Sequence, residues 1–296
     1  MNFRSFLSHQ LKQNNALTLL LLVNSIIYIG LTLTTLIFQL FNVNLSAWIA
    51  SSLCLSASIP EFLSKPWTVL TYMFVHTGFF HLFFNMLCLY WFGKLFQESF
   101  VRKQLTGVYL LGGLVGGGLY MAAFNIFPYL SEHLAGSSLL GASAAVMAII
   151  TAAAVTNPNR QLRLLFIGAI KIKYVAIAAV IISMLSITSS NAGGQIAHLG
   201  GAAAGWLYAV LLQKHIDILR PITFIGDKLS VIFVLRKRKS TPKTTYHYVK
   251  SDADFNQQKA RNDAEMDIIL DKIRKSGYGS LSDKEKKKLF DHSANL

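Results

Sequence analysis

The sequence predicts an all-α, polytopic membrane protein built as a bundle of six transmembrane helices. Of its 296 residues, 53% are hydrophobic and only 14% are charged, far less charge than a soluble protein carries. The acidic residues are segregated, because only Glu61, Glu98 and Glu132 precede Asp217. Six segments are apolar and long enough to cross a bilayer, which takes about 20 residues for roughly 30 Å of hydrocarbon.

The six expected spans are 17–40, 79–97, 106–127, 140–157, 173–189 and 195–213. A further apolar stretch at 221–235 is short and is interrupted by Asp227 and Lys228. We expect it to form an interfacial helix, with a seventh span as the alternative. The first apolar run is too long for a signal-peptide core and lacks a small-residue cleavage site, so we expect no cleavable signal peptide.

The basic residues predict the orientation of the spans. The first, third and fifth connections contain only Lys65, whereas cytoplasmic connections characteristically retain Lys and Arg. We therefore expect both termini in the cytoplasm and the protein in the cell (inner) membrane. The formal charge of +14 does not indicate nucleic-acid binding, because 18 of the 28 Lys and Arg residues follow residue 213. Two cysteines are too few for a disulfide framework.

Four regions follow from this pattern: a cytoplasmic N-terminus (1–16), the membrane domain (17–213), an interfacial segment with a basic linker (214–250) and a cytoplasmic helical tail (251–296). The cluster Arg236–Lys239 suits contact with anionic lipid headgroups, although a solvated charge run is the alternative.

The tail is expected to be helical. Ile268, Ile269 and Ile273 have helical spacing, and Ser282-x-x-Glu285 is a capping box that begins a last short helix. The sequence assigns this tail no chemistry, so regulation or partner binding is only a hypothesis.

Four polar residues are expected at one depth of the membrane. His81 and Asn85 lie in the first two turns of the second span, Ser143 in the first turn of the fourth, and His198 near the start of the sixth. All three spans run inward, so at about 1.5 Å per residue the four side chains lie roughly 5–10 Å below the outer helix ends. Taken singly, a serine, an asparagine or a histidine could serve helix packing, but their shared depth favours a site.

The residue types narrow the chemistry of such a site. No HExxH motif is present, and no Asp occurs before residue 217, which argues against a zinc protease, an aspartyl protease and a Ser-His-Asp triad. A Ser-His dyad remains, in which His198 takes the proton of Ser143, with no metal and no cofactor. Asn85, His81 and the Ser143 N–H could stabilise an oxyanion. Gly201 and Gly205 would let the two helices approach closely.

At this point the chain resembles the rhomboid intramembrane proteases over residues 60–213. The resemblance rests on Trp67 and on three short motifs in matching order, which are His76-x4-His81-x3-Asn85, Gly141-Ala142-Ser143-Ala144 and Ala197-His198-Leu199-Gly200-Gly201-x3-Gly205. It implies Ser143 as nucleophile, His198 as general base, and His81 with Asn85 in the oxyanion site. It also implies substrates that are transmembrane proteins, cut near the outer end of their helix.

Three positions depart from the family pattern. Ala144 stands where Gly is common, Met147 where many relatives have a Tyr against the histidine, and Thr68 where Arg is frequent. A softer thioether contact would replace the aromatic stacking on His198. Two alternatives to a protease stay open: a catalytically inactive rhomboid relative that binds membrane proteins, and a transporter or channel with a polar cavity.

Overall fold

The computed structural model describes residues 15–164, 168–221, 266–286 and 289. The chain forms two compact units, residues 1–236 and 237–296. Most of the expected interfacial segment 221–235 and the whole basic cluster Arg236–Lys239 lie outside the described residues, as do most of the expected cytoplasmic N-terminus and the first part of the expected tail.

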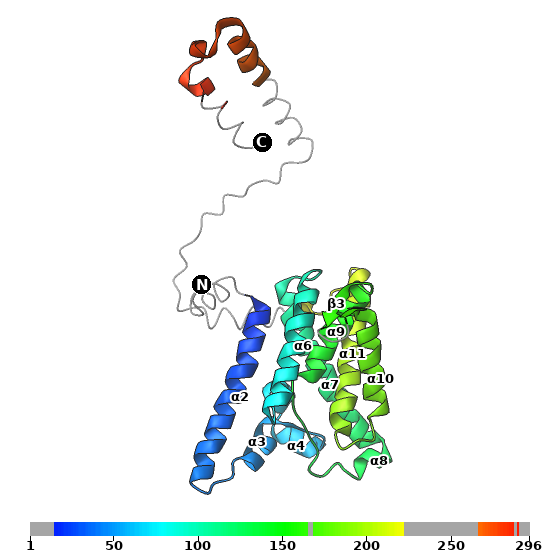
Figure 1. Cartoon of the computed structure of the whole chain (residues 1–296). Helices are drawn as coiled ribbons and strands as arrows, with labels where there is room; N and C mark the ends of the chain where they lie inside the picture. Colours follow the sequence, from blue (N-terminus) through cyan, green and yellow to red (C-terminus); the bar gives the residue numbers. More distant parts are fainter. Residues whose placement is uncertain (1–14, 165–167, 222–265, 287–288, 290–296) are drawn as a thin grey trace. The chain divides into compact units, whose positions relative to one another are not determined.

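The first unit is an all-α membrane bundle, as predicted (Figure 1). Four helices are long and apolar enough to cross a membrane, namely α2 (Ala16–Leu40), α6 (Phe79–Gln97), α7 (Arg102–Ile126) and α11 (Ala192–Gln213). Two shorter apolar helices, α9 (Ser143–Thr156) and α10 (Ile172–Leu185), have 14 residues each. At about 1.5 Å per residue each measures about 21 Å, so the length criterion does not confirm the predicted count of six spans.

Two helices are shorter than the apolar segments predicted to span the membrane, for local reasons. The segment predicted at 140–157 becomes helical only at Ser143, because Gly141 has φ +109°, a left-handed conformation that interrupts a right-handed helix. The segment predicted at 173–189 ends as a helix at Leu185, and Ser186 to Ser190 form turns.

The long first connection is structured and lies at the same end of the bundle as the third connection. It contains α3 (Ser46–Leu53), β1 (Leu55–Ser56), α4 (Ile59–Ser64), α5 (Thr68–Thr71) and the 3-10 turn η1 (Tyr72–Phe74). The third connection contains α8 (Pro128–Ser131) and β2 (Ser138–Leu139), and β2 pairs antiparallel with β1. Figure 1 shows α3, α4 and α8 at one end and the hairpin of β3 (Gln161–Leu164) with β4 (Gly168–Lys171) at the other.

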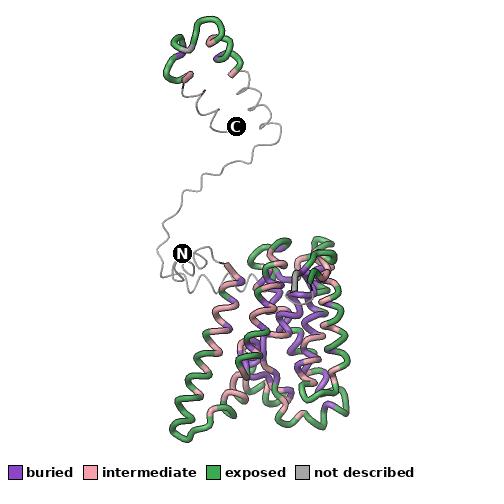
Figure 2. Tube along the Cα trace, in the orientation of Figure 1, coloured by how far each residue is buried: buried purple, intermediate pink, exposed green. Residues whose placement is uncertain are grey.

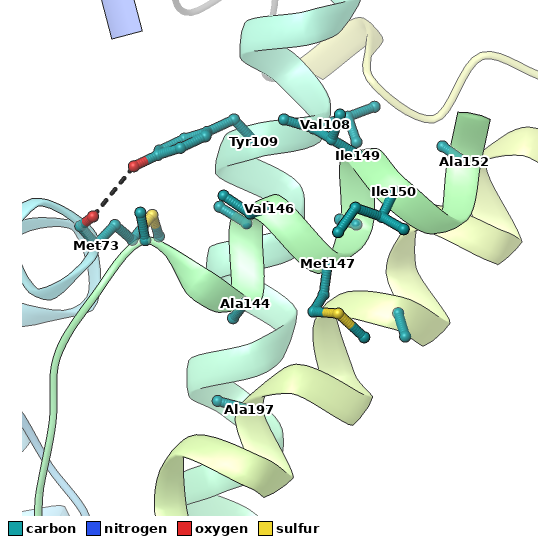
Figure 3. Packing of buried hydrophobic residues seen from close by; sticks show 14 of the residues in the cluster. Met73, Val108, Tyr109, Ala144, Val146, Met147, Ile149, Ile150, Ala152 and Ala197 are labelled. Carbon is teal, nitrogen blue, oxygen red and sulfur yellow. Dashed lines mark hydrogen bonds between the residues drawn. The ribbon is translucent and has the colours of Figure 1, made fainter. Parts of the chain in front are cut away.

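Burial is concentrated where α7, α9 and α11 pack together (Figure 2). In the most apolar stretch of α7, 56% of residues are buried inside the protein, against 17% in α2. The core also contains polar contacts: Tyr109 donates a hydrogen bond of 3.1 Å to the Met73 carbonyl (Figure 3) and contacts the buried Asn24. Helix α9 is buried along most of its length among the neighbouring helices, so this short helix lies in the centre of the bundle.

The second unit contains a helix at 266–276, the 3-10 turn η2 (Tyr278–Ser280) and a helical turn at 283–286. The predicted capping box is confirmed, because Ser282 N–H donates to Glu285 at 2.7 Å and Glu285 N–H donates back to Ser282 Oγ at 3.4 Å. Lys272 also binds the Glu285 carboxylate at 2.9 Å. Of the predicted apolar residues Ile269 is buried, whereas Ile268 is exposed.

Candidate active site

Ser143 is the first residue of α9, and a glycine turn places it there. The N–H of Gly141 donates a hydrogen bond of 2.9 Å to the Tyr72 carbonyl, which ties this turn to η1. A Cβ on Gly141 would lie 2.8 Å from His81 Nε2, so only glycine gives both the left-handed φ and the room for the imidazole. Ala142, fully buried, is the residue that directly precedes the helix. The turn therefore brings His81 beside the serine.

The helices that carry Ser143 and His198 are in backbone contact. A Cβ on Gly201 would overlap the carbonyl oxygen of Ala144, and a Cβ on Gly205 would overlap that of Ala148. The buried Ala197, next to His198, packs near Ala144 in the same cluster (Figure 3). The small-residue face expected from the sequence thus lies against α9.

His198 has a partner that the sequence analysis did not identify. Its Nδ1 lies 3.2 Å from the hydroxyl oxygen of Ser183 on α10, within hydrogen-bond distance. Ser183 is 3% exposed although both its neighbours in the chain are exposed. One signal was available: Ser183 is the only polar residue from Val175 to Leu185, and it follows the buried Ala176 by seven residues, on the same helix face.

Ser143 itself makes no side-chain hydrogen bond to any described residue, including His198. The expected contact between the two is therefore not formed in this conformation. Hydrogen bonds between catalytic groups are often long in unliganded enzymes and shorten when substrate binds.

His81 and Asn85 occupy one face of α6, as their spacing predicts. Asn85 donates a hydrogen bond of 3.0 Å to the His81 carbonyl, and His81 Nδ1 lies 3.4 Å from the hydroxyl of Thr77. The buried His76 packs edge-on against His81, with ring centroids 5.0 Å apart. Among the described residues, neither ring nitrogen of His76 has a hydrogen-bond partner of good geometry, so its contact with His81 is one of ring packing.

One cavity of about 820 Å³ joins these residues. It is bordered by helices α6, α9, α10 and α11 and by the strand before the glycine turn. The sequence-predicted residues that line it are His81, Asn85, Ser143, Met147 and His198. Ser183 also faces this cavity. Three elements far apart in the sequence thus present a hydroxyl, two imidazoles and an amide to one partly open cavity, a set of groups that can carry out acyl transfer.

Of two further residues singled out in the sequence, Met147 lines the cavity and Trp67 does not. Met147 is buried on α9 and lines the cavity one turn below Ser143, the position where the resemblance would place an aromatic ring. Trp67 is half exposed, and its indole N–H donates a hydrogen bond of 2.9 Å to the Ser52 carbonyl. Trp67 therefore fastens two parts of the long first connection and does not line the cavity.

A model of the rhomboid domain matches residues 63–215, and a family of unknown function, DUF6576, matches residues 250–295. Two relatives come from Arabidopsis thaliana. "RHOMBOID-like protein 12, mitochondrial" is 32% identical over 157 residues, which cover 50% of this chain and 46% of the relative.

The second, "Inactive RHOMBOID-like protein 8", is 29% identical over 82 residues, which cover 28% of this chain and 23% of the relative. Each match thus spans less than half the length of the relative. The rhomboid match, by contrast, covers just over half of this chain and contains every residue of the candidate site. The chain therefore belongs to the rhomboid family.

Proposed function

We propose that this protein is an intramembrane serine endopeptidase that cleaves transmembrane proteins, with Ser143 as nucleophile and His198 as general base. The observation that carries the proposal is that both side chains, on helices in backbone contact, face one cavity together with His81 and Asn85. Family membership alone does not decide the activity, because one relative is named as inactive.

In the proposed reaction Ser143 Oγ attacks the carbonyl carbon of the scissile peptide bond. His198 Nε2 accepts the serine proton and then donates it to the leaving amine nitrogen as the C–N bond breaks. A water molecule, deprotonated by the same imidazole, attacks the resulting acyl-enzyme ester. The imidazolium returns that proton to Ser143 Oγ as the ester C–O bond breaks, which releases the new carboxyl terminus and restores the serine. The proposed reaction uses no carboxylate, since no Asp precedes residue 217 and none of Glu61, Glu98 and Glu132 lines the cavity.

The negative charge on the tetrahedral oxygen needs hydrogen-bond donors. The Ser143 N–H is available because the first N–H groups of a helix have no acceptor within that helix. Asn85 and His81 border the same cavity and carry the side-chain donors. Donors of this kind typically contribute about 10²–10³ in kcat each.

The same proposal includes the arrangement in the membrane. We propose that α9 and α10 count with the four longer helices as six crossings, that both termini are cytoplasmic, and that the protein resides in the cell membrane. Lys65 alone among the basic residues lies in the connections at the α3 and α8 end, which supports placing that end outside. Labelling of single cysteines at Ser46 and Arg160 with an impermeant maleimide tests this, since only the Ser46→Cys variant should react in intact cells.

A fluorophosphonate probe tests the activity. Ser143 Oγ should displace fluoride from phosphorus and become covalently labelled, because an activated serine does so. Labelling should disappear in Ser143→Ala and fall by at least about 100-fold in His198→Ala, with both variants at wild-type membrane levels. Ser25→Ala provides a control, because its hydroxyl donates to the Leu21 carbonyl on α2 and Ser25 does not line the cavity. Equal labelling of the Ser143→Ala variant would refute the assignment.

A second candidate function is binding of membrane proteins without cleavage. Two observations favour it: the missing hydrogen bond between Ser143 and His198 and the relative named inactive. An unlabelled wild-type protein that still captures transmembrane helices would support this candidate over the protease.

A further inference from the structure

Ser183 is a buried polar residue on α10, a helix whose other side chains are mostly apolar and exposed. It is buried on α10 between the exposed residues Ile182 and Met184. The buried residues of α10 are Ile172, Ala176 and Ser183, so one face of this helix turns toward the bundle. The Ser183 Oγ on that face reaches His198 Nδ1 at 3.2 Å.

The proton arrangement of His198 depends on what Nδ1 contacts. A neutral imidazole carries one proton, and the nitrogen that lacks it is the one that can act as a base. For Nε2 to accept the proton of Ser143, the imidazole proton must be on Nδ1, where it needs an acceptor. Among the described residues, Ser183 Oγ is the only hydrogen-bond partner of Nδ1.

The usual orienting group is absent from this site. In a Ser-His-Asp triad a buried carboxylate accepts the Nδ1 proton and fixes both tautomer and ring rotation. Here Glu61, Glu98 and Glu132 are the only carboxylates before Asp217, and none of them lines the cavity. The side chain at the site of the expected aromatic support is Met147, which has no hydrogen-bond acceptor of comparable strength.

We propose that Ser183 is the positioning residue of the dyad, which accepts the Nδ1–H hydrogen bond of His198 and so presents Nε2 to Ser143. This inference rests on the proposed protease function and specifies how its base is held. Ser183 acts through His198, and its hydroxyl need not contact the substrate.

The expected effect is on the chemical step. Without the hydroxyl the imidazole loses the contact that selects its tautomer and rotation, while the cavity that receives a ligand keeps its other walls. We expect Ser183→Ala to lower the maximal rate of labelling by a fluorophosphonate about tenfold, the equivalent of one hydrogen bond. The probe concentration at half-maximal rate should change less than about twofold, because that parameter reports uniform binding.

The experiment uses the full-length chain in lipid bilayers. Ser183→Ala is compared with Ser183→Thr, which restores a hydroxyl, and with Ser186→Ala, whose hydroxyl lies at the end of the same helix and outside the cavity. Ser183→Thr and Ser186→Ala should label near the wild-type rate. If Ser183→Ala labels as fast as wild type, or if the threonine variant is as slow as the alanine variant, the hydroxyl has no positioning role.

A second readout does not depend on catalysis. The ¹⁵N resonances of histidine distinguish the two neutral tautomers, and the His198 signals are identified by their absence in a His198→Gln variant. Wild type should show Nδ1 protonated, and Ser183→Ala should show a mixture of both tautomers. A wild-type protein that does not react with the fluorophosphonate but has His198 protonated at Nδ1 would refute the protease function and support the contact between His198 and Ser183. The Nε2-protonated form in wild type would refute the positioning proposal even if labelling occurs.

Discussion

Helix α11 contacts α9 and α10 in different ways. The contact with α9 sets the distance between the Ser143 and His198 backbones, whereas the contact with α10 sets the orientation of the His198 ring. Toward α9 the contact is backbone to backbone, with Gly201 against the Ala144 carbonyl and Gly205 against that of Ala148. Toward α10, the side chains of His198 and Ser183 lie within hydrogen-bond distance of each other at the cavity. Ile177, Ile181 and Ile182 on α10 are exposed.

The difference shows that a Ser-His dyad can meet its two geometric requirements separately. Backbone packing sets the distance between the two residues, and a side-chain contact sets the rotation of the imidazole. Close-packed backbones have little freedom to shift, so the α9–α11 contact determines how far apart the Ser143 and His198 backbones lie. The rotation of an imidazole about its side-chain bonds is not set by backbone distance, and a polar contact from a third helix can set it. Breaking the first contact should disturb the fold, whereas breaking the second should disturb only the chemistry.

The largest effect is expected at Gly201. Gly201→Val would place a branched side chain where even a Cβ overlaps the Ala144 carbonyl, and overpacking of this kind costs at least about 1–3 kcal/mol. We expect loss of the folded protein or a strong fall in its midpoint of thermal unfolding, together with loss of probe labelling. Gly118→Ala is the matched control, because a Cβ there meets no atom within 4 Å. A stable Gly201→Val protein with wild-type labelling would contradict the close contact described above.

Two isoleucines allow the side-chain packing of α9 and of α10 to be compared. Ile149 on α9 is fully buried, and Ile181 on α10 is 49% exposed. Ile149→Ala should lower the free energy of unfolding by about 2–5 kcal/mol because it leaves a cavity, and Ile181→Ala should change it by less than about 0.5 kcal/mol. Denaturation of both variants in the same detergent provides the comparison. Similar losses at the two positions would mean that α10 is packed as tightly as α9.

The smallest effect is expected in the C-terminal unit, which polar contacts stabilise. The Ser282 N–H, together with Lys272 and the Ser282 hydroxyl, lowers the pKa of Glu285 to about 2, against about 4.3 in an unfolded chain. Because the folded pKa is the lower one, this stabilisation is complete above about pH 5 and is lost as the pH falls toward 2.

Amide hydrogen exchange of residues 266–286 in the full chain, corrected for the intrinsic effect of pH, should therefore show protection that decreases on acidification through this range. Glu285→Gln should remove the pH dependence attributable to this carboxylate, while Asp271→Asn, which alters an exposed contact with Lys275, should retain it. Protection that is independent of pH in the wild type would contradict the role of Glu285.

Much of the fold was predictable from local patterns. Hydrophobic runs located all six apolar helices, because a lipid environment requires long apolar segments with internally satisfied backbones. The capping box at Ser282 and Glu285 was also predictable, since its two hydrogen bonds join residues three apart in sequence. Helix ends were less predictable, because the ends near Ser143 and Leu185 depend on turn geometry rather than on hydropathy.

Sequence by itself determined the composition of the site: a serine, two histidines and an asparagine at one predicted depth, no aspartate to complete a triad, and glycines that permit two helices to meet. The tertiary structure decided which atoms meet. It placed His81 against Gly141, left Ser143 without a hydrogen bond to His198 and brought Ser183 to Nδ1. Periodicity specifies which face of a helix is polar, but contacts between residues such as 183 and 198 depend on how two helices are rotated and packed against each other.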